Sequence, residues 1–264
     1  MTRRFALITG ASSGIGKELA RLLARGGYDL LAVARNKQAL ESLKDELYAR
    51  YGTEVHILAF DLAHQNSALK VAEAAAALPG RVEILVNNAG IGDYSFLADA
   101  DWHRISQMIN LNIYTPTYLT KLILPQMLKA KNGRILNVAS TAAFFPGPLM
   151  SVYYASKSYL RSFSLGLARE LKGTGISVTV LFPGGTDSKF FKRAGMEKSR
   201  LAAKKRLANA YEVAQFGYEK MMEGKKIAIP GAGGKIMALL SRLLPETVLA
   251  SLAYQAQKPS KKVK

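Results

Sequence analysis

Residues 5–16 read Phe-Ala-Leu-Ile-Thr-Gly-Ala-Ser-Ser-Gly-Ile-Gly, an apolar run followed by a turn that holds three glycines. The run predicts a buried strand over residues 5–9, and the leucines and alanines of residues 17–26 predict a helix after the turn. A glycine-rich turn lets backbone amides approach a phosphate, and the helix N-terminus adds the positive end of its dipole. The stretch therefore predicts the start of a nucleotide-binding fold. Its Gly-x-x-x-Gly-x-Gly spacing differs from the usual Gly-x-Gly-x-x-Gly, and an ordinary strand-to-helix turn is the alternative.

A second apolar strand is predicted over residues 28–34, which completes the first strand–helix–strand unit. In dinucleotide-binding folds, an acidic residue at the end of this strand binds the ribose 2′-hydroxyl. This chain has Ala34 and then Arg35 at that point. A guanidinium can bind a 2′-phosphate, and no acid is there to repel it. The pattern therefore favours NADP(H) over NAD(H), with a solvated loop arginine as the alternative.

The rest of the chain continues this alternation of strands and helices. Further strands are predicted over residues 55–60, 82–86, 133–140, 175–182 and 226–230, and helices over residues 36–51, 66–78, 101–130, 152–171 and 212–223. Crossovers of this kind require a parallel sheet that is covered by helices on both faces. We expect a single doubly wound α/β domain over residues 1–257, without an internal repeat or a domain linker. Pro116 and Pro125 are expected to interrupt the helix over residues 101–130.

Polar residues follow several of these strands. Asp61 and Leu62 come after the third strand, and Asn87-Asn88-Ala89-Gly90 after the fourth. Asp61 is a candidate acceptor for an adenine amino group or, alternatively, a cap for its own loop. The asparagines beside a glycine suit a tight turn and also a cofactor ribose lying over it. Asn112 stands among apolar neighbours, and a buried asparagine needs hydrogen-bond partners.

The segment after the fifth strand carries the candidate chemistry. Ser140 ends the strand, and Tyr153 and Lys157 stand four residues apart at the start of the next helix. Residues at this spacing share a helix face, so both side chains can enter one pocket. A nearby ammonium is expected to lower the pKa of the phenol, which would make Tyr153 a general acid or base. Tyr154 stands only three residues before Lys157. The alternative is that Tyr153 is a helix-terminal tyrosine in water.

Together these motifs resemble the classical short-chain dehydrogenases/reductases, from Thr9 to about Ser188. Five motifs carry the resemblance in the right order: Thr9 to Gly16, Asp61-Leu62, Asn87 to Gly90, Ser140 with Tyr153-x-x-x-Lys157, and Pro183-Gly184. The resemblance implies a Rossmann-like fold with a seven-stranded parallel sheet. It also implies an oxidoreductase that transfers a hydride between NADP(H) and a carbonyl or secondary alcohol.

The resemblance further implies a catalytic tetrad of Asn112, Ser140, Tyr153 and Lys157. Tyr153 would exchange a proton with the substrate oxygen, Ser140 would bind that oxygen, Lys157 would lower the tyrosine pKa and bind the nicotinamide ribose, and Asn112 would hold a relay water. Family members that use NADP(H) often have a basic residue before the second glycine of the first motif. Ser13 stands there, so Arg35 would carry the preference. The implied cofactor residues are Gly10, Ser12, Ser13, Gly14, Ile15, Gly16, Arg35, Asp61, Leu62, Asn87, Ala89, Gly90, Tyr153, Lys157, Pro183, Gly184 and Thr186.

Composition limits the other possibilities. The 264-residue chain has no cysteine and three scattered histidines, which argues against disulfides, a thiol nucleophile and a metal site. Its net charge of +18 suggests anionic partners, although a solvated basic surface is the alternative. Basic residues concentrate in 189–206 and in the tail 258–264, but they are not interleaved with aromatics, and no nucleic-acid partner is expected. We expect a cytoplasmic location.

The C-terminal part resembles the family only loosely. Residues 186–210 are expected to form a basic, mobile lid over the substrate, and residues 258–264 a disordered tail. Residues 234–254 are expected to form an apolar helical segment with two apolar clusters, for which packing on the core or a subunit interface is preferred over contact with a membrane surface. The lid and these clusters suggest a hydrophobic or acyl-type ketone as the substrate. A dimer or tetramer is implied by the resemblance, and a non-catalytic NADP(H)-binding regulator or scaffold is the alternative function.

Overall fold

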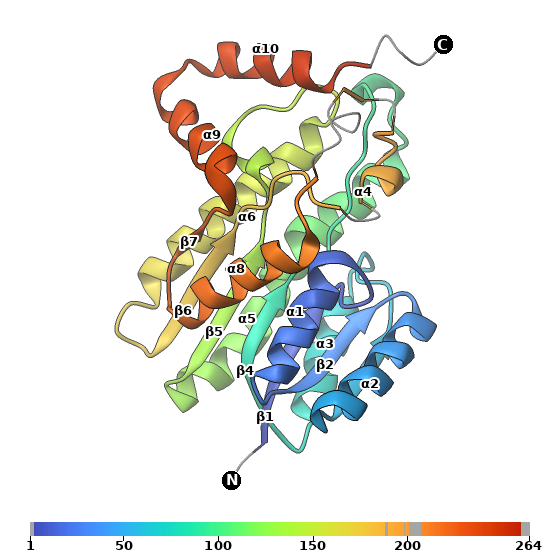
Figure 1. Ribbon diagram of the computed structural model, residues 1–264, viewed down its shortest axis with the longest axis vertical. Coiled ribbons are helices and arrows are strands. Elements are labelled where there is room, and N and C mark those ends of the chain that lie inside the picture. Colours follow the sequence, from blue (N-terminus) through green and yellow to red (C-terminus); the bar gives the residue numbers. More distant parts are fainter. Residues whose placement is uncertain (1–2, 188–189, 198, 201–206, 260–264) are drawn as a thin grey trace.

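The computed structural model describes residues 3–187, 190–197, 199–200 and 207–259. Its seven strands form one parallel sheet, as predicted, and their order is β3-β2-β1-β4-β5-β6-β7. The helices cover both faces (Figure 1). The strands are β1 Arg3–Thr9, β2 Asp29–Ala34, β3 Val55–Ala59, β4 Gly80–Asn87, β5 Gly133–Val138, β6 Ile176–Leu181 and β7 Ile227–Ala228.

The helices lie close to their predicted ranges, the expected C-terminal helical segment consists of two helices, and a further short helix occurs within residues 186–210. The α-helices are α1 Gly14–Arg25, α2 Lys37–Tyr51, α3 Ser67–Ala76, α4 Trp102–Ile109, α5 Thr115–Ala130, α6 Ser151–Glu170, α7 Phe190–Arg193, α8 Ala210–Met222, α9 Gly231–Leu243 and α10 Glu246–Gln257. Two short 3-10 helices, η1 Leu97–Asp99 and η3 Thr141–Phe144, follow β4 and β5.

The central strand β1 shows why its sequence is an unbroken apolar run. Ala6 and Ile8 pack on one face of the sheet with α1, α2 and α8. Phe5 and Leu7 pack on the other face with α3, α5 and α6. Successive strand residues point to opposite faces, and both faces here are covered by helices. Residues 5–9 are therefore all buried, as in other parallel sheets.

In the segment 101–130, the prediction that Pro116 and Pro125 interrupt the helix is wrong. Pro116 stands in the first turn of α5, where a proline is tolerated, but Pro125 lies inside that helix and does not end it. Leu119, Ile123 and Met127 of the same helix are buried, so packing outweighs the hydrogen bond that the proline removes. The irregularity occurs earlier, where a π-helical turn, η2 Asn110–Tyr114, joins α4 to α5. Turns of this type often occur at functional sites.

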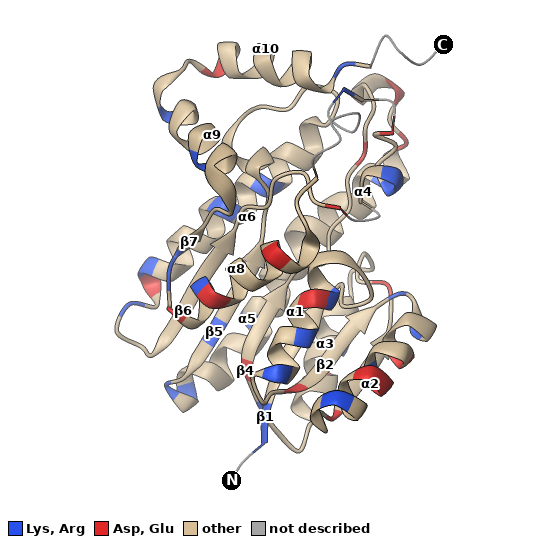
Figure 2. Cartoon of the chain, viewed as in Figure 1, with Lys and Arg blue, Asp and Glu red and all other residues tan. Residues whose placement is uncertain are grey.

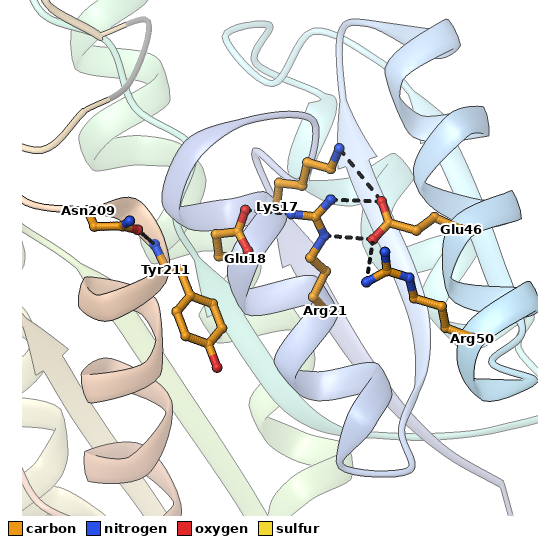
Figure 3. A network of polar contacts seen from close by, with 7 residues as sticks. All are labelled: Lys17, Glu18, Arg21, Glu46, Arg50, Asn209 and Tyr211. Carbon is orange, nitrogen blue, oxygen red and sulfur yellow. Dashed lines mark hydrogen bonds and ion pairs between the residues drawn. The ribbon is translucent and has the colours of Figure 1, made fainter.

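A network of ion pairs joins α1 to α2 (Figure 3). Arg21 donates two hydrogen bonds of 2.8 Å to the two carboxylate oxygens of Glu46 and one of 2.7 Å to Glu18. Lys17 and Arg50 lie farther from Glu46, each at 3.8 Å. Charge-assisted, bidentate hydrogen bonds of this kind are stronger than hydrogen bonds between neutral groups. The network therefore fixes the helix that starts at the glycine turn against its neighbour.

The two C-terminal helices lie beyond the carboxyl ends of the strands (Figure 1). Within the expected lid segment 186–210 the structure describes α7 and a parallel bridge between Thr186 and Ala208. Residues 188–189, 198, 201–206 and 260–264 lie outside the described residues, and so does most of the expected disordered tail. None of the helices described is both long enough and apolar enough to cross a bilayer.

Candidate active site

A cavity of about 530 Å³ lies at the carboxyl ends of the strands. This is the usual place for a ligand in an open α/β sheet, and the volume is typical of a ligand site. Loops after β1 to β6 contribute to it. The predicted site residues that line it are Gly10, Ser12, Ser13, Ile15, Arg35, Asp61, Leu62, Ala89, Gly90, Ser140, Tyr153, Lys157, Pro183, Gly184 and Thr186.

The glycine turn after β1 is held in a tight conformation. Gly10 and Gly14 have positive φ angles of 71° and 56°, which favour glycine. A Cβ on Gly16 would stand 2.2 Å from the carbonyl oxygen of Gly10, so the backbone closes there only without a side chain. The first turn of α1 is Gly14-Ile15-Gly16-Lys17. The amide of Lys17 donates to the carbonyl of Ser13, so the first three amides of the turn and the positive dipole end can face an anion.

Asn88 holds this turn from the neighbouring strand. Its Nδ2 donates to the carbonyl oxygens of Thr9 and Gly10, at 2.9 and 3.2 Å. In return, Thr9 Oγ1 accepts from the backbone amides of Asn88 and Ala89. Asn88 also lines the cavity, although it is absent from the predicted cofactor residues. Its motif was recognised in the sequence, but the pattern could not decide which of two adjacent asparagines faces the site.

Asn87, which was predicted to contact the cofactor, is directed into the protein. Its Nδ2 donates to Thr120 Oγ1 at 3.1 Å and to Asn137 Oδ1 at 2.8 Å, and the residue is 5% exposed. Asn87 thus ties β4 to α5 and β5. Gly14 and Gly16 likewise shape the turn without being among the described residues that line the cavity.

Arg35 and Asp61 stand together at one end of the cavity. The side chain of Arg35 is 60% exposed, and its Nη1 lies 3.8 Å from Asp61 Oδ2. The other carboxylate oxygen of Asp61 accepts from the backbone amide of Ala63 at 3.0 Å. Asp61 therefore caps its own loop while it still faces the cavity. The exposed guanidinium remains accessible to an anionic group.

Tyr153 is buried at the other end, in hydrogen-bonding contact with Ser140. Burial raises the pKa of the Tyr153 phenol, and the hydrogen bond with Ser140 opposes that rise. Ser140 is itself held at the start of η3, where its Oγ accepts from the amide of Ala142 at 3.1 Å. The Phe190 ring lies 5.2 Å from the Tyr153 ring, so the lid segment contributes to the burial. The phenol is protonated at neutral pH.

The structure does not show the lowering of the Tyr153 pKa that was expected from Lys157. Lys157 Nζ donates to the carbonyl oxygen of Val138 at 3.1 Å and lies 5.7 Å from the centroid of the Tyr153 ring. Burial lowers the pKa of Lys157 to about 8. Desolvation by burial outweighs the hydrogen bond with Ser140, so the pKa of Tyr153 is raised where the sequence suggested a lowering by Lys157.

Asn112 lies in the π-helical turn and has the partners expected of a buried asparagine. Its Oδ1 accepts from the amide of Ile91 at 3.0 Å, and its Nδ2 donates to the Ile91 carbonyl at 2.9 Å and to Ser156 Oγ at 3.0 Å. A Cβ on Gly90 would stand 3.2 Å from Lys157 Nζ and 3.3 Å from Asn112 Oδ1. The structure therefore brings Asn112 and Lys157 together beside Gly90. The relay role of Asn112 stays a prediction.

Several residues around the cavity were not predicted. The α9 and α10 helices supply Met237, Leu240, Leu249, Leu252, Ala253 and Gln257, and α6 supplies Tyr154. We call α9 and α10 the roof. The apolar clusters were expected to pack on the core or to form a subunit interface. In the structure α9 has no buried residue, and both helices line the cavity. Their only signal in the sequence is apolar character, which does not reveal what they cover.

A family model described as short chain dehydrogenase matches residues 4–199. The chain is 37% identical over 186 residues to a very-long-chain 3-oxoacyl-CoA reductase from Anas platyrhynchos. That match covers 68% of this chain and 58% of the relative, so the chain spans less than two thirds of that protein. These matches show that the chain belongs to the short-chain dehydrogenase family.

Two solved structures are similar over almost the whole chain, including the roof. A short-chain dehydrogenase from Sphingobium yanoikuyae in complex with NADPH is 30% identical, with a TM-score of 0.82 over 98% of this chain and 99% of that chain. A bulky-bulky ketone specific alcohol dehydrogenase from Comamonas testosteroni is 25% identical, with a TM-score of 0.79 over 100% of both chains. The seven-stranded parallel sheet is thus the fold of the family.

Proposed function

We propose that the protein is an NADP(H)-dependent reductase of hydrophobic ketones. The observation that carries this proposal is that one cavity joins a glycine turn and an exposed arginine to a buried tyrosine hydrogen-bonded to a serine. A nucleotide with a 2′-phosphate suits the first end, and a carbonyl oxygen suits the second. The Sphingobium relative was solved with NADPH, which supports the choice of cofactor.

The residues present fit such a cofactor. The close approach of Gly16 to Gly10 leaves no room for a side chain at the turn, and the start of α1 can accept the pyrophosphate. Arg35 would hold the 2′-phosphate, and Lys157, beside Gly90, would hold the nicotinamide ribose. When bound, the nicotinamide would supply the hydride.

Residues of the protein would then supply the proton for the carbonyl oxygen. The carbonyl oxygen gains negative charge during reduction, and Ser140 and Tyr153 are hydrogen-bond donors positioned to stabilise it. Because burial raises the pKa of Tyr153, the phenol starts protonated and can give its proton to that oxygen. At neutral pH the phenol is therefore in the form that a ketone reduction requires.

The surroundings of Tyr153 support a hydrophobic substrate. Phe190, Phe191, Met196 and the apolar roof residues line the same cavity. Apolar side chains of this kind exclude water and bind hydrocarbon. The Comamonas relative is named for bulky ketones and the Anas relative for very-long-chain 3-oxoacyl-CoA. Ketones with long or bulky apolar groups are therefore the substrate class we propose.

Cofactor choice is tested first, because that measurement needs no substrate. NADPH and NADH are titrated separately into wild type, Arg35→Ala and the control Arg169→Ala, which removes an exposed positive charge on α6. Nicotinamide fluorescence reports binding. We expect NADPH to bind wild type and the control more tightly than NADH, and Arg35→Ala to lose about tenfold or more of this preference. Equal binding of both nucleotides to wild type would contradict the proposed preference.

The reaction is tested next with ketones of increasing apolar size and with small polar ketones, using Tyr153→Phe as the blank. We expect NADPH-dependent reduction that is fastest for the large apolar ketones. Preference for the polar ketones would contradict the substrate class. Binding of NADPH without reduction of any ketone would contradict catalysis and favour a cofactor-binding regulator.

A further inference from the structure

A buried glutamine links the roof to the tyrosine next to Tyr153. Gln257, the last residue of α10, has an exposed fraction of 0% and lines the cavity. Its Nε2 donates to the Tyr154 hydroxyl at 2.9 Å, and its backbone carbonyl accepts from the Tyr94 hydroxyl at 2.6 Å. Among the residues that the structure describes, its Oε1 has no hydrogen-bond partner. Buried polar atoms in proteins are nearly always paired, so this oxygen calls for a donor.

Tyr154 completes the arrangement. Its hydroxyl oxygen accepts a hydrogen bond from Gln257 Nε2, and its own O–H has no acceptor among the described residues. Burial raises the pKa of Tyr154 to about 12, so the phenol keeps its proton at neutral pH. The pair thus offers at least one free donor and one free acceptor. If the amide is turned by 180°, Tyr154 donates to Oε1, and the pair still offers at least one of each.

The position of the pair relates it to the reacting carbonyl. The Tyr154 ring lies 6.1 Å from the Tyr153 ring, edge to face, and both residues line the cavity. Met237, Leu249 and Leu252 surround the same space with apolar side chains. A molecule whose carbonyl reaches Tyr153 can therefore place another of its groups at the pair.

We propose that Gln257 and Tyr154 form a subsite for a hydroxyl or an amide on the substrate, separate from the carbonyl bound by Ser140 and Tyr153. Both groups donate and accept a hydrogen bond and match the pair in either amide orientation. The proposal rests on the proposed function, because it assumes a carbonyl at Tyr153. It narrows the substrate to an apolar ketone that carries a second, neutral polar group.

The test uses methyl n-alkyl ketones from octanone to dodecanone, each paired with its analogue that has a hydroxyl at the far chain end. A second set places an N-methylcarboxamide there. For each pair the ratio of kcat/KM is measured in wild type, Gln257→Leu and Tyr154→Phe. Gln255→Leu is the matched control, since Gln255 is an exposed residue of the same helix.

We expect wild type to favour the polar member of at least one pair by roughly tenfold, a typical effect of one or two hydrogen bonds. Gln257→Leu and Tyr154→Phe should each remove most of this preference, and Gln255→Leu should keep it. A purely structural role would lower kcat/KM equally for both members of a pair. An unchanged ratio in both variants, or a wild type without preference for any polar ketone, would overturn the proposal.

A binding measurement separates this proposal from the proposed function. The same ketone pairs are titrated by calorimetry into each variant saturated with NADP⁺, and thermal unfolding confirms that each variant is folded. Wild-type preference that disappears in Gln257→Leu supports the subsite even if no ketone is reduced, whereas the proposed function would then have failed. Turnover without any difference in affinity or rate within the pairs would overturn the subsite alone.

Discussion

The floor and the roof of the cavity are built in different ways. The floor, which comprises residues 9–16 and 87–91, is held by backbone atoms and by short polar side chains such as Thr9 and Asn88. The roof presents mainly apolar side chains to the cavity and is tied to the rest of the molecule through Gln257, and every residue of α9 remains at least partly exposed. Figure 2 shows few charged residues on the roof, whereas α1 and α2 carry both signs.

This difference matches the two proposed tasks of the site, which are binding of the nucleotide and recognition of the substrate. Backbone amides and carbonyls offer the same contacts whatever the neighbouring side chains are, so the floor suits a fixed ligand such as a nucleotide. The surface of the roof depends on each side chain that points inward, such as Leu249 or Gln257. The roof therefore suits recognition of the substrate, whose structure varies more than that of the nucleotide.

The largest effect is expected for a variant that impairs catalysis and leaves both floor and roof unchanged. Tyr153→Phe removes the proposed proton donor and leaves the ring, which packs near Tyr154 and Phe190. We expect kcat/KM for ketone reduction to fall on the order of a thousandfold, with NADPH affinity nearly unchanged in the fluorescence titration. Substantial remaining activity would show that another group supplies the proton.

The next effect tests the floor. Gly16→Ala places a Cβ 2.2 Å from the Gly10 carbonyl oxygen, which forces the backbone apart and costs about 2–3 kcal/mol. We expect reduced stability in denaturant unfolding and NADPH affinity lower by tenfold or more. Gly166→Ala on α6 is the control, because its Cβ would meet nothing within 4 Å. Equal NADPH affinity in the two variants would contradict the close-fitting turn.

The same contrast explains which features could be predicted from sequence. The sheet, the glycine turn and the Tyr153–Lys157 pair follow from periodicity and from contacts between residues close in the chain. Gln257 meets Tyr154, which is 103 positions earlier, and nothing local indicates that contact. The choice between Asn87 and Asn88 depends on strand pairing and twist. The pKa of Tyr153 depends on burial by distant residues such as Phe190.

A smaller effect tests the roof. Leu249 is 4% exposed and lines the cavity, whereas Leu243 on α9 is 68% exposed. Leu249→Ala should lower the free energy of unfolding by about 2 kcal/mol and raise KM for apolar ketones while NADPH affinity stays constant. Leu243→Ala should change stability by less than about 0.5 kcal/mol. A loss of NADPH affinity in Leu249→Ala would show that roof and floor are not independent.

The smallest effect is expected for the ion pair between Arg21 and Glu46, which holds α1, the helix after the floor's glycine turn, against α2. The hydrogen bonds from Arg21 are the main cause that lowers the pKa of Glu46 below its ordinary value of 4.5. A carboxyl whose pKa is lower in the folded state stabilises the fold above its unfolded pKa. That stabilisation is lost as the pH falls through the folded pKa.

Glu46→Gln should therefore lower the free energy of unfolding by roughly 1 kcal/mol at neutral pH, the scale of a partly exposed pair. The difference from wild type should shrink as the pH falls below about 4.5, and it should also shrink in high salt. Glu41→Gln is the control on the same helix, since Glu41 is half exposed and lies 3.6 Å from Lys37. Denaturant unfolding across the pH range measures both variants. If the Glu46→Gln difference stays constant with pH, its cause is lost packing and the ion pairs do not hold α1 in place.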